Sequence, residues 1–248
     1  MKPFEILAHR VRARLSPSVV VSYPKSGRTW LRVLLHELGL ETPFTHAGSS
    51  EERGALFEAL PPAIDYWRRK RVLFLVRDPR DTLVSSWFQA TRRSRVYSGS
   101  LQDYLREPRF GIEKIVRFHR LWLDSRDSFP GLLPLSYESM LREPGQEFRR
   151  AVSFLTRREP SQELLAAAVE RASFANMRRL EAGGAGKALF GVRLAPGDAS
   201  DPDSFKTRRG VAEGWRDYFT EDDTAYAEAV FARHDYSSFL TAHLRPQG

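Results

Sequence analysis

The sequence predicts a single-domain α/β fold, in which a parallel β-sheet is flanked by helices on both faces. Three short apolar runs carry this prediction, at 19–23, 72–76 and 131–136, because a helical pattern follows each of them. Apolar strands that alternate with helices are typical of a parallel sheet that is covered on both sides. The chain has 248 residues, of which 42% are hydrophobic, so it is long enough for one large α/β domain and too short for two.

The first unit reads as a strand, a tight loop and a helix. Its strand contains the β-branched run 19–21, which leads directly into the loop. Leucines recur at helical spacing after the loop, whereas Arg28, Arg32 and His36 occupy the opposite polar face. Gly39 predicts the end of this helix.

The second unit begins with the apolar run 72–76 and continues into Asp78 and Pro79. Aspartate at the N-cap and proline at the first helical position predict that a helix starts here. A third, weaker strand is expected at 131–136, where Pro134 interrupts the run, and a further helix follows it. The carboxyl ends of the three strands should form the ligand-binding edge of the sheet.

Three other regions have their own patterns. Residues 1–18 are basic and amphipathic and are expected to form a surface helix or arm, whereas 19–248 form the domain. Glycine and proline crowd residues 182–204, a composition that predicts a mobile loop without packed elements. This loop is either a disordered excursion or a lid over a binding site. Thr220 and Asp223 predict a capping box at the start of the last helix.

Composition excludes several classes of protein. The chain has 39 basic and 31 acidic residues, and its formal net charge of +8 attracts anions of many kinds. The absence of cysteine excludes disulfides, thiolate nucleophiles and cysteine-bound metals, and it suits a reducing, cytoplasmic location. No apolar run approaches the roughly 18 residues of a membrane span, and none resembles a signal peptide core. The six histidines lack close ligand spacing, so we expect no metal.

The loop between the first strand and its helix has the chemistry of an anion site. Backbone N–H groups and the positive end of the helix dipole converge at such a loop. Lys25 adds a cationic side chain, and Gly27 lets the backbone approach the anion closely. Ser26 and Thr29 add hydroxyl donors. The glycine that opens a Walker A motif is absent, so an ordinary ATP-binding loop is disfavoured.

The most specific motif of the chain is Tyr23-Pro24-Lys25-Ser26-Gly27-Arg28-Thr29-Trp30, which closely resembles the phosphosulfate-binding loop of sulfotransferases that use 3′-phosphoadenosine 5′-phosphosulfate (PAPS). The resemblance implies a P-loop-like fold, PAPS as co-substrate, and a loop from Lys25 to Trp30 that holds the 5′-phosphosulfate. It also implies that Lys25 contacts the bridging oxygen and the sulfuryl group, and that Trp30 helps to hold the adenine. Arg28 stands where cytosolic animal members usually have threonine.

Further matches follow in the family's order along the chain. Arg77 and Ser85 resemble the arginine and serine that bind the 3′-phosphate. A bidentate guanidinium and a hydroxyl group on a helix suit that role. Tyr137 resembles a tyrosine that lies near the adenine.

Two more elements complete the resemblance. Phe174 lies in Ala-Ser-Phe, which resembles an adenine-contacting Thr-Ser-Phe element with alanine in place of threonine. Arg208, Arg209 and Gly210 resemble the C-terminal Arg-Lys-Gly loop that closes over the 3′-phosphate. The resemblance therefore implies that all four residues contact PAPS.

The family commonly uses a histidine as general base, located between the phosphosulfate loop and the arginine-bearing strand. His36 and His46 lie in that interval, and His36 is expected to face solvent. His46, in Phe-Thr-His, resembles the family's Lys-Thr-His element, and a neutral imidazole can accept a hydroxyl proton near neutral pH. Lys25 and His46 are therefore the expected catalytic residues. The alternative is that His46 is a surface residue and the base is His119 or Glu51.

Two other functions stay open. A nucleotide kinase would share the strand-loop-helix unit but would need Mg²⁺ ligands and a Walker motif. A nucleic-acid-binding protein is suggested by a pI near 10.0 and by basic runs such as 68–71, although such runs are usually solvated faces. We expect instead a sulfotransferase that acts on a hydroxyl or amine of a small-molecule or glycan acceptor and binds no nucleic acid. A homodimer is one alternative for its assembly.

Overall fold

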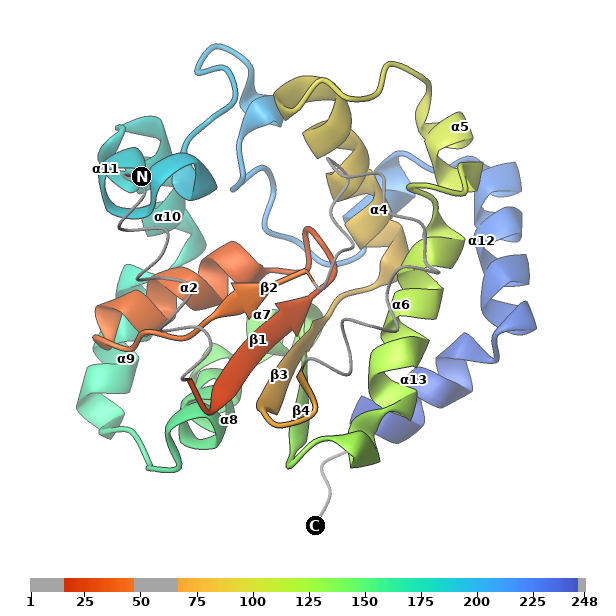
Figure 1. Ribbon diagram of the computed structural model, residues 1–248. Helices are drawn as coiled ribbons and strands as arrows, with labels where there is room; N and C mark the ends of the chain where they lie inside the picture. Colours follow the sequence, from red (N-terminus) through yellow and green to blue (C-terminus); the bar gives the residue numbers. More distant parts are fainter. Residues whose placement is uncertain (1–15, 47–66, 245–248) are drawn as a thin grey trace.

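The computed structural model describes residues 16–46 and 67–244, and its central sheet confirms the predicted fold class (Figure 1). Within these residues the sheet has four parallel strands in the order β2-β1-β3-β4. The strands are β1 (Ser18–Ser22), β2 (Phe44–Thr45), β3 (Arg71–Val76) and β4 (Leu132–Ser136).

Helices cover both faces of the sheet (Figure 1). One layer holds α2 (Arg28–Glu37), α7 (Tyr137–Arg142), α8 (Pro144–Thr156), α9 (Gln162–Arg171), α10 (Phe174–Ala182) and α11 (Ala185–Phe190). The other layer holds α4 (Pro79–Phe88), α5 (Leu101–Arg106), α6 (Ile112–Asp124), α12 (Glu221–Arg233) and α13 (Tyr236–Leu244).

The alternation of side chains along the strands divides the core into two parts. Val19 and Phe74 belong to the cluster under α4, α6, α12 and α13, whereas Val20 and Leu73 belong to the cluster under α2 and α8. Successive residues of a strand point to opposite faces, so two continuously apolar strands supply both cores. Trp122 is fully buried and stacks on Phe74 with ring centroids 5.9 Å apart, as expected for a packing residue.

Local signals in the sequence place several element ends. Asp78 caps α4 by accepting a hydrogen bond from the backbone N–H of Arg80, and Pro79 follows at the first helical position. The predicted capping box of Thr220 and Asp223 starts α12. These predictions are confirmed because each depends only on residues within one helical turn.

The expectation for residues 182–204 is wrong in one respect. This stretch contains α11 and two short 3₁₀ helices, Gly191–Leu194 and Pro202–Ser204. Phe190 and Leu194 are buried in the core beside α2. Two apolar side chains are thus enough to pack the segment despite its glycines. Its mobility stays a prediction, and the predicted arm at 1–18 falls almost entirely outside the described residues.

Within the described parts of the chain, no helix is both long enough and apolar enough to cross a membrane. The same residues contain no cluster of three or more metal-ligating side chains.

Candidate functional site

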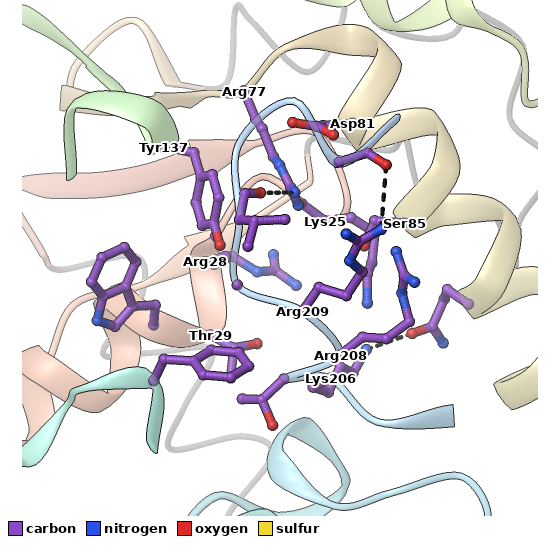
Figure 2. A pocket seen from close by; sticks show the side chains of 18 of the residues that line it. Lys25, Arg28, Thr29, Arg77, Asp81, Ser85, Tyr137, Lys206, Arg208 and Arg209 are labelled. Carbon is purple, nitrogen blue, oxygen red and sulfur yellow. Dashed lines mark hydrogen bonds between the residues drawn. The ribbon is translucent and has the colours of Figure 1, made fainter. Parts of the chain in front are cut away.

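A cavity of about 320 Å³ opens at the carboxyl edge of the sheet, and side chains from six segments that lie apart in the chain line it (Figure 2). Its size suits a small-molecule site. Ser26, by contrast, is fully buried within the loop beside it. The other predicted site residues all line this cavity: Lys25, Gly27, Arg28, Thr29, Trp30, His46, Arg77, Ser85, Tyr137, Phe174, Arg208, Arg209 and Gly210.

The loop between β1 and α2 has a backbone that few residue types adopt. Lys25 has a φ of 71°, and Gly27, the N-cap of α2, has a φ of 93°. A Cβ atom on Gly27 would lie 2.7 Å from Cδ2 of Tyr137, so only glycine fits there. Left-handed backbone at a non-glycine residue is costly and is commonly retained at binding sites.

Three buried polar atoms in or beside this loop lack a partner among the described residues: Oγ of Ser22, Oγ of Ser26 and Nε of Arg77. Buried polar atoms nearly always form hydrogen bonds, so these three atoms at the carboxyl edge of the sheet favour a polar ligand. Because all three can donate, and Lys25 and Arg28 line the same cavity, the residues fit an anionic ligand.

Arg77, at the end of β3, connects the two sides of the cavity. One guanidinium nitrogen, Nη1, donates to the carbonyl oxygen of Lys25 at 3.1 Å, and Nη2 donates to that of Val211 at 3.3 Å (Figure 2 shows the first bond). The guanidinium also lies over the ring of Tyr137, 4.3 Å from its centroid. Arg77 is therefore fixed in place before any ligand binds.

Asp81, on α4, holds one end of the C-terminal segment that lines the cavity. Its carboxylate accepts hydrogen bonds from the backbone N–H groups of Glu213 at 2.8 Å and Trp215 at 2.9 Å. Burial raises the pKa of Asp81 above its ordinary value, although Arg77 opposes the shift.

Glu181, at the end of α10, holds the other end of the same segment. It is fully buried and accepts from the backbone N–H groups of Lys206 at 2.7 Å and Thr207 at 2.9 Å. The hydroxyl of Thr207 donates to it as well, at 2.7 Å. Sequence reasoning missed Asp81 and Glu181 because their partners lie far along the chain, and no local pattern marks them.

The two arginines of the C-terminal segment have partners of their own. Arg208 lies 4.0 Å over the ring of Phe88 and donates to the hydroxyl of Tyr218 at 2.7 Å. Arg209 is more exposed and pairs with Asp217 at 2.6 Å. Both side chains nevertheless line the cavity, together with Ser85 of α4.

Aromatic side chains form the part of the cavity wall that is expected to contact the adenine. Trp30 packs edge-on against Tyr137, with centroids 6.0 Å apart, and against Phe148 at 5.1 Å. Phe174 remains 41% exposed and lies under Gly210, where a Cβ atom would approach its Cδ2 to 2.3 Å. Phe174 is thus available to a ligand and also shapes the turn at Gly210.

His46 follows β2 and lies against the strand that leads into the first loop. Its Nδ1 donates to the carbonyl oxygen of Ser22 at 2.9 Å, which leaves Nε2 without a proton in the neutral ring. Burial lowers the pKa of His46 well below 6.5, and the positive charges of Arg28, Lys206 and Arg32 lower it further. The imidazole is therefore neutral at neutral pH and can accept a proton.

The other candidates for a base do not share this position. His36 is exposed on α2, as expected. His119 is fully buried on α6, where it is hydrogen-bonded to the hydroxyl of Tyr236 at 2.6 Å, and burial lowers its pKa to about 3. It does not line the cavity, so the alternative that His119 is the base is wrong. Glu51 lies outside the described residues.

A polar pair that sequence reasoning missed lines the same cavity as His46. The amino group of Lys206 donates to Oε1 of Gln89 at 2.7 Å (Figure 2). Gln89 is the first residue of a π-helical turn, Gln89–Arg93, that continues α4. Such turns are frequent at functional sites, but nothing in the sequence marks this one.

Two comparisons with known proteins agree on one family. A model of the sulfotransferase domain matches residues 57–239. Cytosolic sulfotransferase 13 of Arabidopsis thaliana is 24% identical over 84% of this chain and 74% of its own length, and mouse sulfotransferase 1B1 is 23% identical over 87% and 81%.

Solved structures show the same fold. Mouse sulfotransferase SULT7A1, complexed with PAP, matches 92% of this chain and 87% of its own with a TM-score of 0.68 and 19% identity. Retinol dehydratase, in complex with androsterone and the inactive cofactor PAP, matches 90% of this chain and 82% of its own with a TM-score of 0.61 and 20% identity.

Proposed function

The chain belongs to the sulfotransferase family, and on that premise we propose that Lys25 and His46 catalyse the transfer of a sulfuryl group from PAPS to an acceptor hydroxyl. PAPS-dependent sulfuryl transfer is the activity of the chain, and the kinase and nucleic-acid alternatives are not favoured.

The unpaired donors of the cavity support an assignment for PAPS. We assign the 5′-phosphosulfate to the first loop, where Ser26 Oγ lacks a partner among the described residues and Lys25 lines the cavity. The 3′-phosphate is assigned to Arg77, whose Nε also lacks such a partner, and to Ser85 with the C-terminal arginines. The adenine is assigned to the aromatic wall of Trp30, Tyr137 and Phe174.

The proposed reaction is an in-line displacement. The acceptor oxygen forms a bond to sulfur while the bond between sulfur and the phosphate oxygen breaks. Nε2 of His46 takes the proton of the acceptor hydroxyl, and Lys25 stabilises the charge that develops on the departing phosphate oxygen. No metal is required in this scheme.

The observation that carries the proposal is the hydrogen bond from Nδ1 of His46 to the carbonyl oxygen of Ser22. It fixes the tautomer in which Nε2 is the proton acceptor, and it orients the ring in the same cavity as Lys25. The anionic charge of bound PAPS should oppose the repulsion from Arg28, Arg32 and Lys206, and so raise the pKa of His46 toward the range of an efficient base.

The acceptor is proposed to be a hydroxyl or amine of a small molecule or glycan. The small-molecule alternative is supported by one structural neighbour, retinol dehydratase, which is complexed with androsterone in one structure and with retinol in another. A cytoplasmic location is proposed as well, on the name of the Arabidopsis relative.

The test is the substitution His46→Ala, read with a verified acceptor. General-base catalysis is worth about a hundredfold to ten-thousandfold, so kcat should fall within that range while PAP still raises the melting temperature. Because the base must be neutral, the activity of the unsubstituted enzyme is full above the pKa of His46 and is lost as pH falls through it. This loss of activity on the acidic side of the pH–rate profile, its acidic limb, should disappear in His46→Ala. A near-normal kcat or an unchanged acidic limb in the variant would place the base elsewhere.

A further inference from the structure

Helix α4 and the turn after it carry a row of side chains that face the C-terminal segment, residues 206–215. Asp81, Ser85 and Gln89 are each four residues apart, so they lie along one face of the helix, and all three line the cavity. Asp81 accepts hydrogen bonds from the backbone of the segment, and Gln89 accepts one from the side chain of Lys206. The helix that supplies Ser85 to the cavity therefore also holds part of the cavity wall.

The π-helical turn at the end of α4 brings a fourth residue toward this row. At about 100° per residue, an unbroken α-helix would place Arg93 roughly 120° around the axis from Asp81. In the π turn, the backbone N–H of Ser94 donates to the carbonyl oxygen of Gln89, five residues earlier, at 2.9 Å. A π turn contains more residues than an α turn, so each residue advances by a smaller angle and Arg93 stays closer to the face of the row.

Arg93 binds both ends of the stretch of chain that precedes the C-terminal segment. Its Nη1 donates to the carbonyl oxygens of Ala195 at 2.7 Å and Ser204 at 2.6 Å, and its Nη2 donates to that of Val192 at 3.4 Å. The same Nη1 lies 4.0 Å from Oε1 of Glu181. The guanidinium therefore ties this stretch, and the end of α10, to the end of α4.

The contact of Arg93 is buried and closely packed. The side chain is 10% exposed, and burial lowers its pKa, whereas the charge of Glu181 opposes the shift. A Cβ atom on Gly197 would lie 3.0 Å from Cγ of Arg93, so a larger residue there would crowd the arginine. An apolar side chain could fill the same space without burying a charge. Only the arginine also fixes the positions of three carbonyl oxygens and a carboxylate.

The contact reaches the cavity through Glu181. The carboxylate of Glu181 accepts from the backbone N–H groups of Lys206 and Thr207, which directly precede the two arginines assigned to the 3′-phosphate. Arg93 limits where this carboxylate can lie, because it holds the carbonyl oxygen of Ser204 and places a positive charge beside Oε1. The position of the wall that faces the 3′-phosphate thus depends on a residue that does not itself line the cavity.

We propose that Arg93 is a positioning residue for the co-substrate: together with Glu181 it forms a clasp that holds the C-terminal segment against the 3′-phosphate and so sets how long the nucleotide stays bound. The proposal rests on the proposed function, because it assumes that the C-terminal arginines contact the 3′-phosphate. It adds a residue that acts on the nucleotide only through others. Substitution of Arg93 therefore weakens the binding of 3′-phosphorylated nucleotides without removing a group from the chemical step, which is assigned to Lys25 and His46.

The experiment compares Arg93→Gln with Arg92→Gln, which removes the exposed arginine directly before it. Calorimetry measures the binding of PAP and AMP, stopped-flow fluorescence measures the rate of PAP release, and steady-state kinetics with a verified acceptor give kcat and the KM for PAPS. In Arg93→Gln, the Kd of PAP and the KM of PAPS should rise about tenfold, since buried carbonyl groups lose their donors. PAP release should become faster by a similar factor.

The remaining quantities should change little. The affinity for AMP should change much less than that for PAP, because AMP lacks the 3′-phosphate, and kcat at saturating PAPS should not fall. Arg92→Gln should keep all values of the unsubstituted enzyme. A merely structural role of Arg93 would lower kcat and the melting temperature of the free enzyme while the folded fraction kept its Kd for PAP.

Two further variants connect the effect to the clasp. Arg93→Lys keeps the charge beside Glu181 but carries its donors on a single nitrogen, so it should lose less PAP affinity than Arg93→Gln and still bind PAP more weakly than the unsubstituted enzyme. In the double variant, Arg93→Gln with Glu181→Gln, PAP affinity should fall hardly further than in Glu181→Gln alone, because two residues that act as one unit are not additive.

Three results would overturn the proposal: the same PAP affinity in Arg93→Gln and Arg92→Gln, equal losses for PAP and AMP, or a loss in the double variant that equals the product of the two single losses. If Arg93→Gln does not fold, full PAP affinity in Arg93→Lys would overturn it as well. Failure of the proposed function looks different, since PAP would then not raise the melting temperature of the unsubstituted enzyme. A stable PAP complex that is indifferent to Arg93 would reject only the clasp.

Discussion

The two segments that face each other across the cavity are held in place in different ways. The phosphosulfate loop, residues 23–30, is shaped by its own strand and helix, by the left-handed backbone of Lys25 and by Gly27. The C-terminal segment, residues 206–215, has no strand or α-helix of its own and depends on two buried carboxylates from other helices. One side of the site is thus determined locally, whereas the other depends on tertiary contacts.

This difference predicts that the first loop mainly determines turnover, whereas the C-terminal segment mainly determines ligand affinity. A loop whose path is set mainly by its own strand and helix can position the group that acts on the transferring sulfuryl, and Arg77 supports it with one hydrogen bond to the carbonyl oxygen of Lys25. A segment held by Asp81 and Glu181 can instead be released and reclosed around a ligand. We therefore expect substitutions in the first loop to change turnover, and substitutions at the anchors of the second to change binding.

The largest effect is expected from Lys25→Ala. The ammonium group stabilises charge that develops only in the transition state, so kcat should fall about a hundredfold or more, with a much smaller loss of PAP affinity. Steady-state kinetics and calorimetry with PAP measure the two quantities. Lys187→Ala, which removes an exposed lysine of α11, is the control. Loss of affinity with normal turnover would mean that this loop too serves binding alone.

A smaller effect is expected from Glu181→Gln. The amide cannot accept from all three donors of Lys206 and Thr207, so at least one buried N–H or O–H group loses its partner, at a cost of about 1–3 kcal/mol. The melting temperature should fall, and PAP affinity should fall about tenfold relative to that of AMP, because the segment carries the arginines assigned to the 3′-phosphate.

The matched control for this substitution is Glu163→Gln, since Glu163 is exposed on α9. A merely structural role of Glu181 would weaken PAP and AMP binding equally. That result would remove the distinction between the two sides of the cavity.

The smallest effect is expected from Arg209→Gln. The side chain is 35% exposed and already pairs with Asp217, so water and that carboxylate screen its contribution to the 3′-phosphate. We expect PAP affinity to fall about threefold, with AMP affinity nearly unchanged. Thermal shifts with both nucleotides measure the ratio, and Arg216→Gln, which removes a neighbouring exposed arginine, is the control. A loss of PAP affinity as large as that in Glu181→Gln would show that the affinity depends more on the charge of Arg209 than on the anchoring of the segment by Glu181.

The same division explains what the sequence could predict. The strands predicted at 19–23 and 72–76, the N-cap at Asp78 and the loop that follows the first strand depend on neighbouring residues, so periodicity, capping and a specific motif were sufficient. The position of His46 in the cavity agrees with the resemblance, whereas its hydrogen bond to Ser22 depends on the pairing of β2 with β1.

Other features had no local signal. β2 has only two residues, too few for a periodic pattern. Phe190 and Leu194 are buried in the core, and the stretch that contains them forms a helix although its glycines predicted a loop. Asp81 and Glu181 look like ordinary helix carboxylates in the sequence, since the amide groups that they accept from become neighbours only in the folded chain.

Arg77 limits how freely this enzyme could be redesigned. Its two terminal nitrogens reach carbonyl oxygens on opposite sides of the cavity, those of Lys25 and Val211, and its Nε is left for a third acceptor. Only a planar fork of donors can span these positions at once, and lysine offers a single point of attachment on a flexible chain. An exchange of arginine for lysine would preserve the charge but disconnect the two walls. In a library of variants, Arg77 is therefore a position to keep constant.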